Sequence, residues 1–192
     1  TKWYGDKMNR PYRQRAQTIA RARNGEASAR DLLRKMLQTD EQDYWRAVAA
    51  NLLERWVGEP AVTQLLVTRL SDTNALVRQN ILQTLAALGP SSPAEVRAAV
   101  QARLTDPARS VRVLAAQSLA PSLPLDSLAG TELLHMLNHN ADQPAGQMQL
   151  GAFALTRGQT TNALQHFQTA ARWDPFSPGI HHEAAIVLSQ LG

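Results

Sequence analysis

The chain has 192 residues, of which 44% are hydrophobic and 19% charged, a composition typical of a folded protein with a sizeable core. It contains no cysteine, which excludes disulfides, thiol chemistry, zinc–cysteine sites and covalent haem attachment within these residues. No apolar run approaches the ~18 residues of a membrane span. The net charge of +4 is uneven, because residues 1–35 carry ten Lys or Arg against three Asp or Glu and residues 36–192 carry ten against thirteen. This asymmetry indicates a surface for an acidic partner near the N-terminus. The start at Thr1, without methionine, leads us to expect a piece of a longer protein.

Apolar residues recur every three or four positions along the whole chain, and no segment alternates with a period of two, so the fold class is predicted to be all-α. Glycine and proline residues interrupt the pattern at regular intervals and mark the ends of the helices. The predicted helices cover residues 10–23, 27–38, 41–57, 60–71, 74–88, 93–105, 108–120, 128–139, 143–157, 160–173 and 178–190. Because the connections are short, successive helices are expected to pack antiparallel.

A repeat in the first part of the chain predicts the architecture. Leu70-Ser71-Asp72, followed by Val77-Arg78, recurs 34 residues later as Leu104-Thr105-Asp106, followed by Val111-Arg112. This pattern resembles the HEAT repeat, a helix pair whose turn carries Asp and whose next helix opens with Val-Arg. The Asp is expected to cap the next helix and to accept hydrogen bonds from Arg of the same or a neighbouring repeat. The units are 10–38, 41–71, 74–105 and a final helix at 108–120.

After Pro121-Ser122-Leu123-Pro124 a second pattern begins, formed by Leu150, Gly151, Ala163, Phe167, Ala170 and Pro175. The spacing of these residues resembles that of the tetratricopeptide repeat. Small residues at Gly151 and Ala163 are expected to let two helices approach closely, with Phe167 filling the space beside them. Pro175 is expected to end the second helix, and Ala170 to admit the next repeat. The match is incomplete, because Gln147 and Ala154 stand where the family has Trp and Tyr. The prediction is therefore a right-handed α-solenoid of antiparallel helix pairs. Its HEAT-repeat domain covers 1–126, and its tetratricopeptide-repeat domain covers 127–192 and is truncated at the C-terminus.

The order of the two arrays, with Trp3-Tyr4-Gly5 in front, resembles the C-terminal region of bacterial multihaem c-type cytochrome-like proteins. This resemblance implies an exported, periplasmic electron-transfer protein whose c-type haem lies only in an upstream domain. No haem motif occurs in these residues. We therefore expect no cofactor in this chain and no catalytic activity, but a protein–protein interaction and scaffolding module. Its partner is expected to be a protein or peptide, such as its own upstream cytochrome domain, rather than a nucleic acid.

Two surfaces are predicted to bind partners. The first is a mostly apolar peptide groove on the first helices of the tetratricopeptide pairs, formed by Met148, Ala152, Leu155, His182 and Ile186. The second is a basic docking surface formed by Arg10, Arg13, Arg15, Arg21 and Arg23. The alternative function is that of a basic HEAT-like nucleic-acid-binding protein or a DNA-repair glycosylase-like enzyme.

The residues that would carry that alternative, or bind a metal, have simpler structural interpretations. Trp45 and Trp56 fit the apolar stripe of one helix, and Asp43 fits a helix N-terminus. His135 and His139 have a spacing that can hold a metal, but no third ligand accompanies them. The sequence contains neither a nucleophile elbow around a serine nor a glycine-rich phosphate loop.

Overall fold

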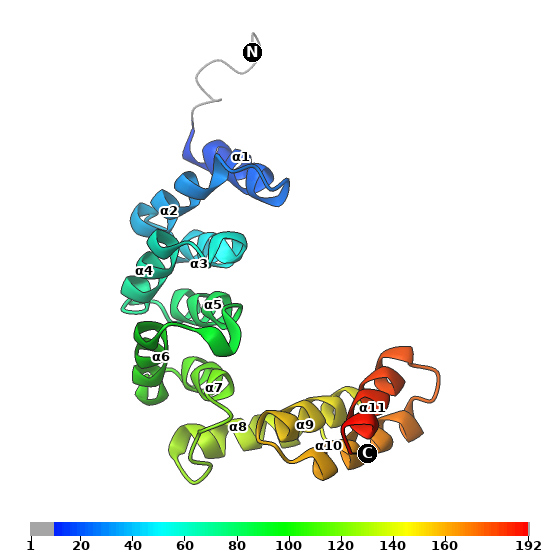
Figure 1. The fold of residues 1–192 in the computed structure, drawn as a ribbon. Coiled ribbons are helices and arrows are strands. Elements are labelled where there is room, and N and C mark those ends of the chain that lie inside the picture. The colour runs from blue at the N-terminus through cyan, green and yellow to red at the C-terminus, as the bar shows by residue number, and fades with distance from the viewer. Residues whose placement is uncertain (1–9, 192) are drawn as a thin grey trace. The chain divides into compact units, whose positions relative to one another are not determined.

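The computed structural model describes residues 10–191, and side-chain positions up to residue 189. Within this part the chain is all-helical and contains no strand, which confirms the predicted fold class, an α-solenoid (Figure 1). Trp3-Tyr4-Gly5 lies outside the described residues. The chain divides into two compact units, residues 1–114 and 115–192. The two predicted domains, with a boundary after residue 126, stay a prediction.

The eleven α-helices of the described residues lie within about two residues of their predicted positions, apart from the ends of two helices, at residues 53–57 and 102–105. They are α1 (Pro11–Arg23), α2 (Ala29–Thr39), α3 (Asp43–Leu52), α4 (Pro60–Arg69), α5 (Ala75–Ala86), α6 (Ala94–Gln101), α7 (Arg109–Ser118), α8 (Leu128–His139), α9 (Pro144–Thr156), α10 (Thr160–Trp173) and α11 (Pro178–Leu191). Two predicted helices end in tighter 3₁₀ turns, at Leu53–Trp56 and Ala102–Thr105. Such turns commonly close α-helices.

In unit 1 the helices form two layers. Helices α1, α3 and α5 follow one another in the first layer, and α2, α4 and α6 follow one another in the second (Figure 1). The core between the layers consists of fully buried aliphatic side chains, including Leu33, Leu37, Leu66, Val77 and Ile81. The Thr84 hydroxyl donates a buried hydrogen bond of 2.9 Å to the carbonyl oxygen of Ala50, which ties α5 to α3. The repeats of unit 1 are thus held by packing across the layers and by polar contacts along them.

In unit 2 the packing of α9 against α10 depends on one glycine. A Cβ atom on Gly151 would lie 2.3 Å from Cε1 of Phe167, so only glycine allows the ring to sit there. Phe167 is 1% exposed and shares a core cluster with Ala154, Ala163 and helix α11 residues such as Val187. The predicted close approach at Gly151 and Ala163, with Phe167 filling the space, is therefore confirmed. Gly158, with φ at +70°, makes the turn between the two helices.

Candidate binding surfaces and the arginine–aspartate ladder

The most regular polar feature of unit 1 is a series of half-buried to buried ion pairs between consecutive repeats, which we call the arginine–aspartate ladder. Its three rungs are Arg15–Asp40, Arg46–Asp72 and Arg78–Asp106. In every rung Nε and Nη2 of the arginine each donate to one carboxylate oxygen, over distances of 2.6 to 3.0 Å. Such two-pronged pairs fix geometry as well as charge. The ladder joins each repeat to the turn of the next.

Each ladder aspartate also organises its own turn. The carboxylate of Asp72 accepts a 3.0 Å hydrogen bond from the N–H of Asn74, and Asp106 accepts one from Ala108. The carbonyl oxygen of Asp72 accepts from Nη1 of Arg78, at 2.8 Å. The prediction that the turn aspartate caps the following helix is wrong for Asp72, because the N-cap of α5 is Asn74, whose side chain accepts from the N–H of Leu76. The contacts do confirm that the turn aspartate accepts hydrogen bonds from arginines of its own and the preceding repeat. The repeated spacing in the sequence predicted this for Asp72 and Asp106.

The surroundings of the ladder carboxylates shift their pKa in one direction. Burial by itself would raise the pKa of Asp106, but hydrogen bonds from Arg78 and Ala108 and the positive charge of Arg103 outweigh it. The pKa of Asp106 therefore lies below its ordinary value. The pKa values of Asp40 and Asp72 are lowered against burial in the same way, chiefly by Arg15 and Arg46. All three side chains carry charge in the folded chain at neutral pH.

The lowered pKa values predict a loss of stability in acid. The ordinary pKa of aspartate is about 3.9. Near and below that pH these aspartates bind protons in the unfolded chain, while they stay ionised in the folded chain. The free energy of unfolding should then fall as the pH is lowered from about 4, while these groups contribute no slope between pH 5 and 8. Urea unfolding at a series of pH values measures the slope. In the Asp106→Asn variant the acid slope should be shallower, and an unchanged slope would contradict this assignment.

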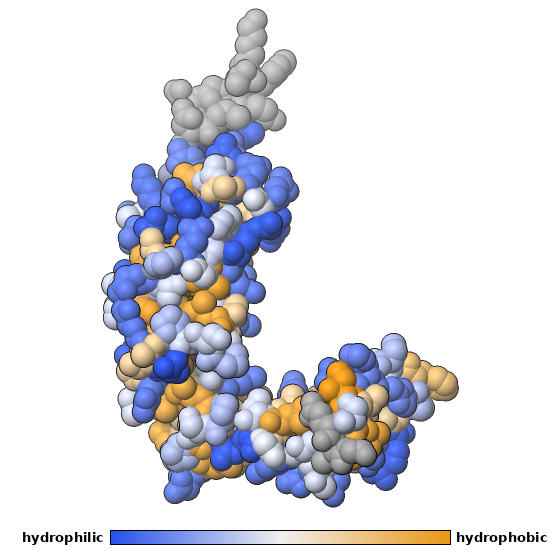
Figure 2. All heavy atoms as spheres, in the orientation of Figure 1, coloured by the Kyte–Doolittle hydropathy of each residue, from blue (hydrophilic) through white to orange (hydrophobic). Residues whose placement is uncertain are grey.

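The predicted basic docking surface lies on α1 and just before it. Arg10, Arg21 and Arg23 are exposed, and Nε of Arg21 lies 4.0 Å from Oε2 of Glu26. Arg13 is half-buried and has interactions within the chain. Arg15 is committed to Asp40, and its guanidinium carbon lies 5.8 Å from the centre of the Trp45 ring. In the structure Arg15 therefore links α1 to the turn between α2 and α3, a role that sequence reasoning missed. On the face seen in Figure 2, this end of unit 1 is mostly hydrophilic.

The residues of the predicted peptide groove lie on α9 and α11 with different degrees of exposure. Met148 and Leu155 are half-buried and pack against the core cluster around Phe167. Ala152, His182 and Ile186 are exposed. Apolar residues reach the surface around α11 on the face seen in Figure 2 (Figure 2). Binding of a peptide to these five residues stays a prediction.

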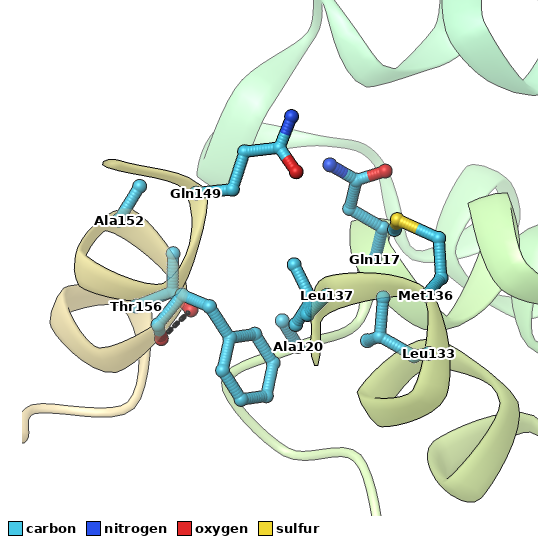
Figure 3. A pocket seen from close by; sticks show the side chains of 9 residues that line it. Gln117, Ala120, Leu133, Met136, Leu137, Gln149, Ala152 and Thr156 are labelled. Carbon is cyan, nitrogen blue, oxygen red and sulfur yellow. Dashed lines mark hydrogen bonds between the residues drawn. The ribbon is translucent and has the colours of Figure 1, made fainter. Parts of the chain in front are cut away.

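A hollow between α8 and α9, within unit 2, is more sharply formed. We call it the α8–α9 groove; it has a volume of about 350 Å³. Its lining residues are Gln117, Ala120, Leu133, Met136, Leu137, Gln149, Ala152, Phe153 and Thr156 (Figure 3). Of these, only Ala152 belongs to the predicted peptide groove. Sequence reasoning missed Gln117, Ala120 and the residues from α8, because α7, α8 and the loop after α7 lie outside the recognised repeat pair.

The residues considered for nucleic-acid chemistry have structural partners. Asp43 accepts a 2.8 Å hydrogen bond from the N–H of Tyr44 and another from the side chain of Asn74. Trp45 is half-buried and packs edge-on against Tyr44, with ring centroids 5.1 Å apart. Trp56 is also half-buried. These contacts favour packing as the role of Trp45 and a structural role in the first turn of α3 as the role of Asp43.

His135 and His139 are exposed on α8 with their rings stacked, 6.5 Å between centroids. In residues 10–191 no group of three or more His, Cys, Asp or Glu side chains is arranged to hold a metal ion. No helix in the same part of the chain is long and apolar enough to cross a membrane.

Comparison with known families gives one match. Two overlapping stretches of the chain, residues 7–86 and 30–120, match the family model of HEAT repeats. Together they span residues 7–120, more than half of the chain, and include all three rungs of the ladder. The comparisons with curated proteins and with solved structures found no match.

Proposed function

The chain belongs to the HEAT-repeat family, and we propose that it is a scaffold that binds a partner protein through side chains presented by successive repeats. Repeat arrays contact mainly their nearest neighbours and offer extended surfaces to partners. HEAT repeats suggest such an interaction role at the level of the family.

A set of exposed apolar side chains at equivalent positions carries the proposal. Tyr12, Tyr44 and Leu76 each stand second in their helices, α1, α3 and α5, and are 55%, 58% and 42% exposed. Single exposed apolar residues are common on protein surfaces, but recurrence at one position of three repeats indicates a continuous binding surface. Tyrosine is also enriched where proteins meet.

The distribution of charge in unit 1 supports a protein partner over a nucleic acid. The ladder carboxylates bind three arginines, Arg15, Arg46 and Arg78. These arginines therefore do not contribute unpaired positive charge to a basic surface. A nucleic acid needs many unpaired Lys or Arg side chains along its path. The exposed arginines of the predicted docking surface, Arg10, Arg21 and Arg23, are confined to the first repeat. A titration that pairs a peptide with a DNA duplex tests this choice.

We propose that α9 and α10 form a tetratricopeptide-like pair, supported by the contact between Gly151 and Phe167. A role in an exported, periplasmic multihaem c-type cytochrome-like protein is supported by the sequence resemblance alone. Haem-attachment motifs encoded upstream of Thr1 would support it. We further propose that the chain itself has no catalytic activity and no cofactor, in keeping with its family.

A further inference from the structure

The α8–α9 groove has walls that are fixed before any partner arrives. Ala120, Leu133 and Leu137 are between 0% and 4% exposed, so the base of the groove is part of the core. Nη1 of Arg157 donates hydrogen bonds to the carbonyl oxygens of Ala120, at 2.7 Å, and Leu123, at 3.1 Å. Arg157 thereby ties the end of α9 to the loop that follows α7. A preformed site binds with a smaller loss of conformational entropy than one that must be ordered.

The chemistry of the groove selects an uncharged occupant. Its nine lining residues include none that carries charge at neutral pH, and several are aliphatic or aromatic. Helix α9 has no charged residue over its whole length of 13 residues. A helix that is apolar all round is normally covered all round. Helix α10 covers the side of α9 that holds Gly151, whereas the side that holds Ala152 borders the groove.

Two carboxamides at the mouth of the groove indicate what kind of apolar occupant fits. Gln117 and Gln149 project over the mouth from the α7 side and the α9 side (Figure 3). Both residues are exposed, and within the described part of the chain neither side chain forms a hydrogen bond. Each carboxamide offers a donor and an acceptor, the same pair that a peptide group requires. An extended segment has such peptide groups free, whereas a helix uses them internally.

We propose that the α8–α9 groove binds an extended, uncharged segment of a partner protein. One aliphatic or methionine side chain of the segment enters the groove between Leu137 and Ala152, and peptide groups on either side of it bond to Gln117 and Gln149. This inference rests on the proposed scaffold function and names the chemistry of one of its partners.

The probe is a short peptide, obtained by selecting a displayed library of random peptides for binding to the full chain. The selected peptides should share an uncharged stretch around Leu, Ile or Met. For one synthetic peptide, Ala152→Glu should weaken binding at least about tenfold, because it places a charge in an apolar groove. The matched control is Ala98→Glu, the same change at an exposed position in the middle of α6, and it should leave the affinity unchanged.

The carboxamides are tested separately, with variants that keep the size of the side chain. Gln117→Leu and Gln149→Leu should each lower the affinity for the peptide about twofold to tenfold, the range expected for one lost hydrogen bond. N-methylation of the peptide's own amides beside the apolar residue should lower the affinity by a similar factor. Thermal unfolding checks that each variant is folded. If Ala152→Glu does not fold, the two glutamine variants still test the groove.

The outcomes separate this inference from the scaffold function. Peptides that bind equally well to Ala152→Glu and to both glutamine variants would overturn the groove assignment and leave the scaffold function standing. Sensitivity to Ala152→Glu without any effect of the glutamine variants or of N-methylation would overturn the extended binding mode. A selection that yields no binding peptide would count against both proposals.

Discussion

Replacing Asp106 by alanine is expected to lower the free energy of unfolding by about 3–5 kcal/mol, the usual cost of removing one partner of a buried ion pair. The side chains of Asp106 and Arg78 are only 1% and 8% exposed. Without the carboxylate, the guanidinium of Arg78 loses two hydrogen bonds, of 2.8 and 2.7 Å, while it stays buried. The N–H of Ala108 loses its acceptor as well. Urea or thermal unfolding measures the loss.

The matched control is Asp31→Ala. Asp31 also contacts two arginines, Arg30 and Arg34, but its side chain is 62% exposed. Water screens such pairs, so this change should cost far less than Asp106→Ala. Equal losses in the two variants would mean that the ladder contributes no more than an ordinary surface ion pair.

Phe167→Ala is expected to destabilise the chain by about 3–5 kcal/mol, through lost burial and the cavity that remains. The ring is 1% exposed and packs against Gly151 where no other residue would leave it room. Phe176 supplies the comparison, since it is 92% exposed. Phe176→Ala should leave the unfolding midpoint almost unchanged. A small effect of Phe167→Ala would contradict the packing of α9 on α10 described above.

The helices could be predicted from the sequence because spacing and punctuation agree along the chain. Apolar residues repeat at helical intervals, and residues such as Gly158 and Pro178 stand at the ends of the segments. The 3₁₀ turns at Leu53–Trp56 and Ala102–Thr105 were not predicted, because apolar spacing continues through a last turn whether it is α or 3₁₀.

The ladder was only partly predictable, for a reason that lies in the repeats themselves. Asp72 and Asp106 stand in recurring Leu-x-Asp segments, with Arg78 and Arg112 at a fixed distance behind them. Arg15 lies in a basic stretch without that signature, and its partner Asp40 is 25 residues away. Its composition therefore indicated an exposed docking residue, whereas tertiary packing makes it a rung.

The groove was the least predictable feature. Its lining comes from α7, α8, α9 and a connecting loop, and these segments share no motif. The resemblance to the tetratricopeptide repeat predicted a mostly apolar face of α9 through Met148, Ala152 and Leu155. It could not show that Met148 and Leu155 pack toward the core cluster while Ala152 borders a hollow, because this depends on how neighbouring helices cross.

A paired titration tests the scaffold function most directly. The full chain is titrated at physiological salt with a peptide from the displayed library and, separately, with a labelled DNA duplex of random sequence. The scaffold function predicts micromolar binding of the peptide and binding of the duplex at least about tenfold weaker. Micromolar binding of the duplex that falls steeply with salt, and that is lost when Arg10, Arg21 and Arg23 are changed to alanine, would contradict it and favour a nucleic-acid-binding protein.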